Sequence, residues 1–157
     1  MKQRNTVWGV GPKFVAVSTL YLAIVYTAGR LAGLPPVAAD PLPLQLLGAV
    51  LLAAGGVVSV VAARTIFMMY KLDRLYRAGL YARCRHPLYA DFISLVAPGV
   101  CLLLNSWPAL TAPFFMYLAF RRLIGQEERG LITAFGDEYL QYKSEVNAVF
   151  PKIAKSM

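Results

Sequence analysis

The chain has 157 residues, of which 58% are hydrophobic, and carries a formal net charge of +8. Its length suits one domain, but its apolar fraction exceeds the roughly 45–50% of soluble domains, so a membrane protein is expected. The basic residues come with no zinc-finger or basic-aromatic signature, which excludes an ordinary nucleic-acid-binding protein and leaves membrane lipids as the expected partner. Cys84 and Cys101 have no metal-ligand spacing and are expected to be free thiols, without a bound metal.

Four stretches are long and apolar enough to cross a bilayer as helices, which takes about 20 residues each. They comprise approximately residues 14–34, 42–63, 88–104 and 107–123. Pro87 precedes the third stretch, at a position where its missing N–H removes no helical hydrogen bond. Only Asn105 and Ser106 separate the last two stretches, which predicts a tight antiparallel hairpin of helices. A pair of long buried helices in a soluble protein is the alternative.

The charges predict how these spans are oriented. Fifteen of the 16 Lys and Arg residues fall in the segments on one side of the membrane, namely residues 1–13, 64–87 and 121–157. The segments on the other side, 35–41 and 105–106, contain none. Because basic segments stay in the cytoplasm, both termini should lie there. We expect an all-α integral membrane protein with four transmembrane helices, forming a single domain over residues 1–157.

Two further segments lie on the side expected to be cytoplasmic. Residues 64–80 mix apolar and basic side chains, as in a helix at the headgroup zone; alternatively, they extend the second span as a helix. Residues 121–149 predict an amphipathic helix if the helix continues through Gly136. Its apolar stripe would contain Ile124, Glu128, Leu131, Phe135, Tyr139, Tyr142 and Val146.

Two neighbouring acids, Glu127 and Glu128, accompany this apolar stripe. Carboxylates on a buried face are costly unless a cation or a ligand satisfies them. Arg85 and His86 come just before the third span, and the two acids come just after the fourth. Because the two spans form one hairpin, its ends return to the same membrane face and should bring these residues together. Taken singly, each residue is also explained as a topology signal, an interfacial anchor or part of a solvated helix face.

Two motifs resemble those of a known family. The first is Gly79-x-Tyr81-x-x-x-Arg85-His86-Pro87-x-Tyr89, and the second, after one hairpin, is Glu127-Glu128-x-x-Leu131-x-x-x-Phe135-Gly136-x-x-Tyr139-x-x-Tyr142, closed by Pro151. In this order and at this separation they are similar to the isoprenylcysteine carboxyl methyltransferase family, whose broader group includes phospholipid N-methyltransferases. The resemblance covers about residues 64–153, whereas residues 1–63 match only as generic membrane spans.

The resemblance implies an integral-membrane enzyme that transfers a methyl group from S-adenosylmethionine to a small lipophilic or lipid-linked acceptor, by carboxyl O-methylation or amine N-methylation. Residues 64–157 would be the catalytic half, with a cofactor pocket open to the cytosol. Matching positions would assign the cofactor to Tyr81, Arg85, His86, Tyr89, Glu127 and Glu128, with Glu128 and His86 also catalytic. In keeping with such an enzyme, the sequence has no Gly-x-Gly-x-x-Gly motif of a Rossmann domain.

Two positions depart from the family pattern. Asp91 stands where the family commonly has glycine, and Glu145 lies near the place of a basic residue that meets the substrate carboxylate in prenylcysteine methyltransferases. An inward-pointing Glu145 would favour a cationic or amine acceptor. A lateral gap beside Pro98, Gly99 and Pro113 would admit a lipid acceptor. The alternatives are a membrane reductase that uses NADPH, as in the related sterol-reductase group, and a membrane scaffold without catalysis.

Overall fold

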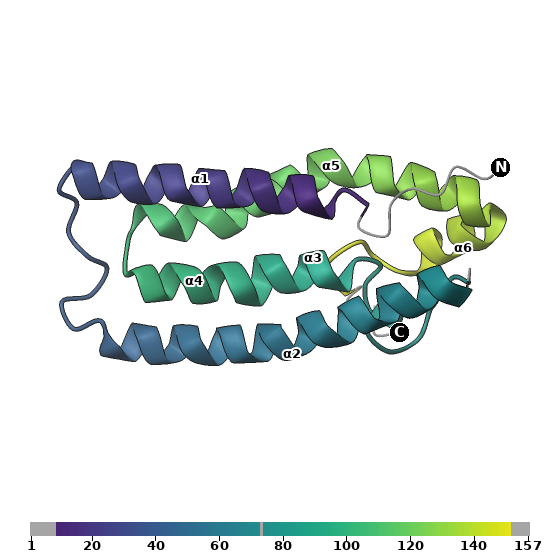
Figure 1. Ribbon diagram of the computed structural model, residues 1–157, viewed down its shortest axis with the longest axis horizontal. Helices are drawn as coiled ribbons and strands as arrows, with labels where there is room; N and C mark the ends of the chain where they lie inside the picture. Colours follow the sequence, from purple (N-terminus) through teal and green to yellow (C-terminus); the bar gives the residue numbers. More distant parts are fainter. Residues whose placement is uncertain (1–8, 73, 152–157) are drawn as a thin grey trace, which may run out of the picture.

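The computed structural model describes residues 9–72 and 74–151, and the regular elements within these residues are all helical (Figure 1). The α-helices are α1 (Gly11–Leu31), α2 (Leu42–Leu72), α3 (Pro87–Asp91), α4 (Ala97–Leu104), α5 (Ala112–Phe135) and α6 (Asp137–Glu145). A π-helical turn, η2 (Phe92–Val96), joins α3 to α4, and two 3-10 turns are η1 (Gly79–Ala82) and η3 (Pro108–Thr111). The predicted all-α class is confirmed.

Three helices are long and apolar enough to cross a membrane: Gly11–Leu31, Leu42–Met69 and Pro87–Leu104, with mean hydropathies of 1.5, 2.4 and 1.8. They support the prediction of an integral membrane protein. The fourth expected span, residues 107–123, is not among them; α5 begins at Ala112 and carries the charged residues Arg121, Arg122, Glu127, Glu128 and Arg129. A topology of four spans with cytoplasmic termini stays a prediction.

The helices pair along the long axis of the bundle: α1 lies beside α5, and α2 lies beside α3 and α4 (Figure 1). Glycines allow a close approach of α1 to η3 and of α2 to α4. A Cβ on Gly29 would lie 2.7 Å from Cγ of Pro108, and a Cβ on Gly48 would lie 2.7 Å from the Gly99 carbonyl oxygen. Small residues permit such backbone contacts between membrane helices. Gly99 itself packs directly against α2, and the lateral gap expected in the hairpin beside Pro98, Gly99 and Pro113 stays a prediction.

The tight turn predicted between the third and fourth stretches is present. It follows α4, where Asn105 adopts a left-handed conformation with φ of 47°, which asparagine tolerates. The Asn105 side chain accepts a hydrogen bond from the Ala38 N–H at 3.0 Å and donates one to the Ala38 carbonyl at 2.8 Å. The turn thereby holds the linker between α1 and α2 at the end of the bundle opposite α6 (Figure 1).

The structure shows where α2 and α5 end, and with that what the segments 64–80 and 121–149 form. α2 continues to Leu72, so the residues up to that point extend the second span. The single helix expected across residues 121–149 is wrong, because α5 ends at Phe135 and α6 begins after Gly136. Gly136 has φ of 56° and ψ of −131°, a conformation that only glycine adopts readily. α6 therefore leaves the axis of α5 and lies across the end of the bundle (Figure 1).

Candidate functional site

Glu128 lies on the buried face of α5 between two cations. Its Oε1 is 2.5 Å from Arg85 Nη2, and its Oε2 is 2.7 Å from Lys143 Nζ on α6. Burial alone would raise the pKa of Glu128, but the neighbouring His86, Lys143 and Arg85 side chains hold it well below its ordinary value. The carboxylate is therefore charged and engaged on both oxygens. Lys143 was missed from the sequence, although it follows Tyr139 by one helical turn.

Arg85 joins this ion pair to the chain that follows α6. Its Nη1 donates to the carbonyl oxygens of Lys143, at 3.1 Å, and of Val146. The backbone N–H groups of Arg85 and His86 donate to the carbonyls of residues 147 and 148, each at 2.9 Å. We call residues 146–150 the closing segment. The turn before α3 thus holds this segment in place, and both Nη atoms of Arg85 are committed to acceptors in the protein.

His86 lies buried between the two acids of α5. Its Nδ1 is 3.5 Å from Glu127 Oε1, and its Nε2 is 3.6 Å from Glu128 Oε1. The ring also meets the rings of Tyr89 and Phe120 edge-on, with centroids 6.0 and 5.9 Å away. Burial lowers the pKa of His86, but the two carboxylates outweigh it and raise this pKa above its ordinary value. The imidazole is therefore disposed to hold a proton near neutral pH.

Glu127 is satisfied by groups from two parts of the chain, the start of α1 and the start of α3. Its Oε2 accepts a hydrogen bond from the Tyr89 hydroxyl at 2.8 Å and one from the Val10 N–H at 3.2 Å. Burial opposes its charge, but His86, Tyr89 and the Val10 N–H lower the pKa of Glu127 below its ordinary value. Gly9 lies against the same carboxylate, since a Cβ there would clash with Oε2. This backbone contribution carries no side-chain signal in the sequence.

The remaining tyrosines of the motifs, Tyr81, Tyr139 and Tyr142, are buried near these charged residues. Tyr81 is buried, and its carbonyl accepts a hydrogen bond from the Tyr142 hydroxyl at 2.6 Å. Within residues 9–72 and 74–151, no hydrogen bond links the Tyr81 hydroxyl to the acids, so the structure does not bring it into their contact. Burial and the nearby Glu128 charge raise the pKa of Tyr139, whose hydroxyl is buried. We define the polar cluster as Arg85, His86, Tyr89, Glu127, Glu128 and Lys143.

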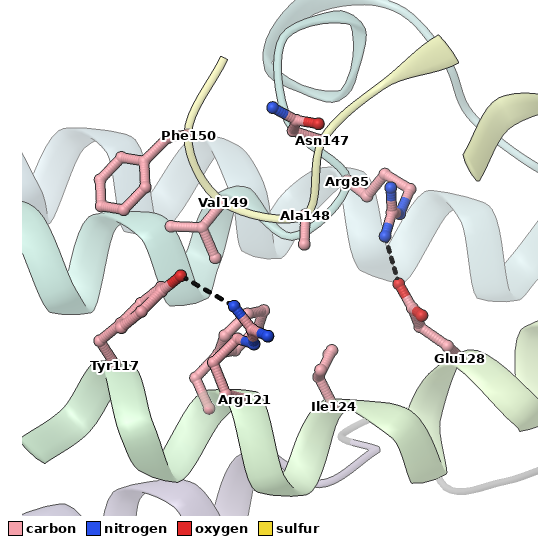
Figure 2. Close-up of a pocket in the computed structure, with 10 residues that line it drawn as sticks. Arg85, Tyr117, Arg121, Ile124, Glu128, Asn147, Ala148, Val149 and Phe150 are labelled. Atoms are coloured by element: carbon pink, nitrogen blue, oxygen red, sulfur yellow. Dashed lines mark hydrogen bonds and ion pairs between the residues drawn. The ribbon is translucent and has the colours of Figure 1, made fainter. Parts of the chain in front are cut away.

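A cavity of about 330 Å³ opens beside the polar cluster, between α5 and the closing segment (Figure 2). Arg85 and Glu128 form its charged end. Its other end is aromatic, with Tyr117 and Phe150, and Arg121 donates a hydrogen bond to the Tyr117 hydroxyl at 3.3 Å. This volume falls in the range of small-molecule sites, which are mostly apolar with a few convergent polar groups.

Three buried donors at the polar cluster have no hydrogen-bond partner among the residues that the structure describes: Arg85 Nε, His86 Nε2 and the Tyr139 hydroxyl. Buried polar groups are nearly always paired, so unpaired ones clustered in one place indicate a position for a ligand or ordered water. In the described part of the chain, no group of three His, Cys, Asp or Glu side chains is placed to hold a metal ion.

The two departures from the family pattern lie outside the cavity. Glu145 is exposed on α6, and its carboxylate accepts a hydrogen bond from Gln141 at 3.0 Å. Because Glu145 is exposed and does not line the cavity, it gives no reason to favour a cationic or amine acceptor. Asp91 is buried against α2 and does not contact the acids of α5.

No protein-family model matches this chain. Among curated proteins, it is 34% identical over 79 residues to protein-S-isoprenylcysteine O-methyltransferases of Saccharomyces cerevisiae and of Mus musculus. It is 36% identical over 77 residues to methanethiol S-methyltransferase 1 of Bradyrhizobium diazoefficiens. The matches cover 50%, 50% and 46% of this chain but only 33%, 28% and 24% of those proteins. Over about half of its length the chain is homologous to these methyltransferases, which confirms its predicted resemblance to the isoprenylcysteine carboxyl methyltransferase family.

Proposed function

We propose that this protein is a membrane methyltransferase that uses S-adenosylmethionine and acts on a small lipophilic or lipid-linked acceptor. One observation carries the proposal: the two sequence motifs meet in a single polar cluster at the charged end of a cavity. The relatives support it, because their names describe methyl transfer to the carboxyl group of an isoprenylcysteine or to methanethiol.

The residues present fit the charged groups of S-adenosylmethionine. The unpaired donors on Arg85, His86 and Tyr139 suit its carboxylate. Glu127 and Glu128 suit its ammonium group or ribose hydroxyls, and Tyr89 and Tyr81 would form the wall of the site. When bound, the cofactor supplies an electrophilic methyl group on a sulfonium. The structure refines one assignment: Arg85 would contribute through Nε, because its Nη atoms already hold Glu128 and the closing segment.

The protein's own contribution to such a reaction is to hold the nucleophile close and in line while it excludes water. Phe120, Ile124 and Val149 line the cavity and are buried, so they supply an apolar wall next to the charged end. The aromatic end, with Tyr117 and Phe150, suits the apolar body of an acceptor. An acceptor placed there would lie with its reactive group toward Arg85 and Glu128.

A thiol or ammonium acceptor has to lose a proton before or during methyl transfer. Glu128 is a weak base here, because its cations hold its pKa low. His86 has a raised pKa, so its neutral imidazole is a stronger base than the Glu128 carboxylate; we assign the role of proton acceptor to that neutral form and assign Glu128 a holding role. A carboxylate acceptor needs neither, since it is already deprotonated at neutral pH.

We further propose that the end of the bundle that carries the polar cluster faces the cytosol, as the distribution of Lys and Arg predicts. Residues 64–157 then form the catalytic half, completed by the Val10 N–H from the start of α1. The cavity lining includes two arginines, Arg85 and Arg121. A nicotinamide dinucleotide, whose several phosphates would need more cations than these, is the less favoured ligand.

Calorimetric binding of S-adenosylhomocysteine to the detergent-solubilised protein tests the proposal. We expect micromolar affinity, which falls about tenfold or more in His86→Ala and Glu128→Ala. Glu145→Ala, which removes an exposed acid that does not line the cavity, is the matched control and should bind as the parent protein does. Failure of the parent protein to bind would contradict the proposal, and binding of reduced nicotinamide dinucleotide instead would establish the reductase alternative.

A further inference from the structure

A carboxylic acid lies inside the third apolar helix, away from the polar cluster. Asp91 is the last residue of α3 and is 3% exposed. Its Oδ2 accepts a hydrogen bond from Ser59 Oγ at 2.5 Å, whereas its Oδ1 is buried and has no hydrogen-bond partner within the described ranges. An acid in an apolar span is costly, so its presence there calls for a function.

The surface of α2 is shaped to receive this side chain. Gly55 lies opposite it: a Cβ on Gly55 would be 3.1 Å from Asp91 Oδ1 and 3.0 Å from Val96 Cγ2. Ser59 follows Gly55 by four residues and so lies one turn along the same face of α2. The glycine gives the carboxyl group room and the serine gives it a hydrogen bond. The contact therefore has a defined direction, unlike the purely apolar packing around it.

The backbone after Asp91 explains why a directed contact matters at this point. The π-helical turn η2 begins at the next residue, and Pro98, near the start of α4, has no N–H to give to the turn before it. A π turn inserts extra backbone and changes the rotation of the residues before it relative to those after it. The close packing of Gly48 on Gly99 holds α4 against α2, on the far side of this turn from α3.

α3 is also the helix that presents part of the polar cluster. It starts directly after His86. Tyr89 and Asp91 are two residues apart on this helix, so their side chains are rotated by about 200° relative to each other and Tyr89 points away from Asp91. On that side the Tyr89 hydroxyl reaches Glu127 at 2.8 Å, and its ring meets Phe14 edge-on with centroids 5.1 Å apart. A rotation of α3 would withdraw Tyr89 and His86 from the acids together.

We infer that Asp91 is a positioning residue for the polar cluster. Its hydrogen bond with Ser59 sets the rotation of α3 and thereby holds Tyr89 and His86 against Glu127 and Glu128. The geometric part of this inference is independent of the reaction, whereas its consequence for cofactor binding rests on the proposed function.

His86 is the chain's single histidine, so its imidazole gives one NMR titration that reports the approach of the acids. The charged groups that face it are Glu127 and Glu128 from α5, with Arg85 beside it. In Asp91→Leu and Ser59→Ala, the acids should lie farther from the ring, and the midpoint should fall by about half a pH unit or more toward its ordinary value. Asp91→Asn keeps an oxygen that can accept the hydrogen bond from Ser59, so its His86 midpoint should stay near that of the parent protein.

Two further variants complete the experiment. Thr65→Ala removes a hydroxyl of α2 that donates only to the Val61 carbonyl, and it should leave the midpoint unchanged. Gly55→Ala crowds the same carboxyl group without removing a polar atom and replaces Asp91→Leu where that variant does not fold. In the variants that move the midpoint, affinity for S-adenosylhomocysteine should fall about tenfold, with Asp91→Asn near the parent value.

The outcomes separate the positioning role from the proposed function. An unchanged midpoint in folded Ser59→Ala and Gly55→Ala overturns the positioning role, and so does a lower thermal stability without a shift of the midpoint. A shifted midpoint supports the role even where the parent protein binds no S-adenosylhomocysteine; that second result contradicts the proposed function alone.

Discussion

Arg85 and Glu128 are 43 residues apart in the chain, yet Nη2 of one lies 2.5 Å from Oε1 of the other. Arg85 precedes α3 and Glu128 lies on α5, so the pair joins the two arms of the helical hairpin at one end. Both side chains are largely buried, with exposed fractions of 8% and 10%. Each charge therefore depends on the other, because an unpaired charge in such a place is costly.

The stability losses of the two single variants of this pair should add up to more than the loss in the double variant. Arg85→Met leaves Glu128 buried with only Lys143 and His86 beside it, and Glu128→Met leaves Arg85 without its carboxylate. We expect each to lower the free energy of unfolding by about 3 kcal/mol. The double variant should cost clearly less than the sum, which chemical unfolding in detergent would measure. Strictly additive losses would show that the two side chains do not stabilise each other.

The polar cluster should make stability depend on pH in two directions. The raised pKa of His86 means that the folded state binds this proton more tightly, so its contribution is complete below pH 6.5 and is lost as the pH rises through that raised pKa. The lowered pKa values of Glu127 and Glu128 mean the reverse. Their contribution is present above pH 4.5 and is lost as the pH falls through those lowered pKa values. Thermal unfolding measured against pH should show highest stability between these limits.

A single variant isolates the alkaline side of this profile. His86→Gln removes the imidazole that titrates, so the decline in melting temperature above pH 6.5 should flatten, while the decline at acid pH should remain. Persistence of the full alkaline decline in His86→Gln would assign it to another group.

The convergence of the polar cluster could be predicted from the sequence because topology alone requires it. A hairpin of two spans returns to its starting side, so Arg85 and His86 had to approach Glu127 and Glu128. The prediction needed no knowledge of side-chain geometry. It also depended little on the exact helix ends, since the turn at Asn105 is short.

Other parts of the site could not be predicted, for identifiable physical reasons. The period of the apolar stripe continued across Gly136, so the pattern gave no sign that this glycine would break the helix. Lys143 reaches Glu128 only because α6 turns at that point. The Val10 N–H is a backbone donor, and a sequence pattern of side chains carries no information about it. The packing of Gly99 on α2 likewise depends on how two helices meet.

Lys143 should matter less than Arg85, although both contact Glu128. Its side chain is 41% exposed, so solvent screens its charge and the pair contributes about 1 kcal/mol at most. Lys143→Met should therefore lower the stability only slightly and weaken S-adenosylhomocysteine binding by a few-fold. Comparison with Arg85→Met under the same conditions is the measurement. Equal losses in the two variants would contradict the ranking by burial.

Gly136 should be sensitive to substitution because of its backbone conformation. Its φ of 56° and ψ of −131° are unfavourable for any residue with a Cβ, although a Cβ would meet no atom within 4 Å. Gly136→Ala should lower the free energy of unfolding by about 1–3 kcal/mol through backbone strain alone. Because the turn aims α6, and with it Lys143 and Tyr139, at the polar cluster, affinity for S-adenosylhomocysteine should fall as well.

Gly125 is the matched control, since it lies within α5 and a Cβ there would meet only Arg129 Nη1, at 3.9 Å. Gly125→Ala should stabilise the helix by about 0.5–1 kcal/mol, because alanine loses less backbone freedom on folding. Chemical unfolding of the two variants would measure both changes in the free energy of unfolding. Opposite signs would establish that the backbone conformation at residue 136, and not the loss of a glycine as such, sets the position of α6. Equal effects of the same sign would remove that explanation for the turn between α5 and α6.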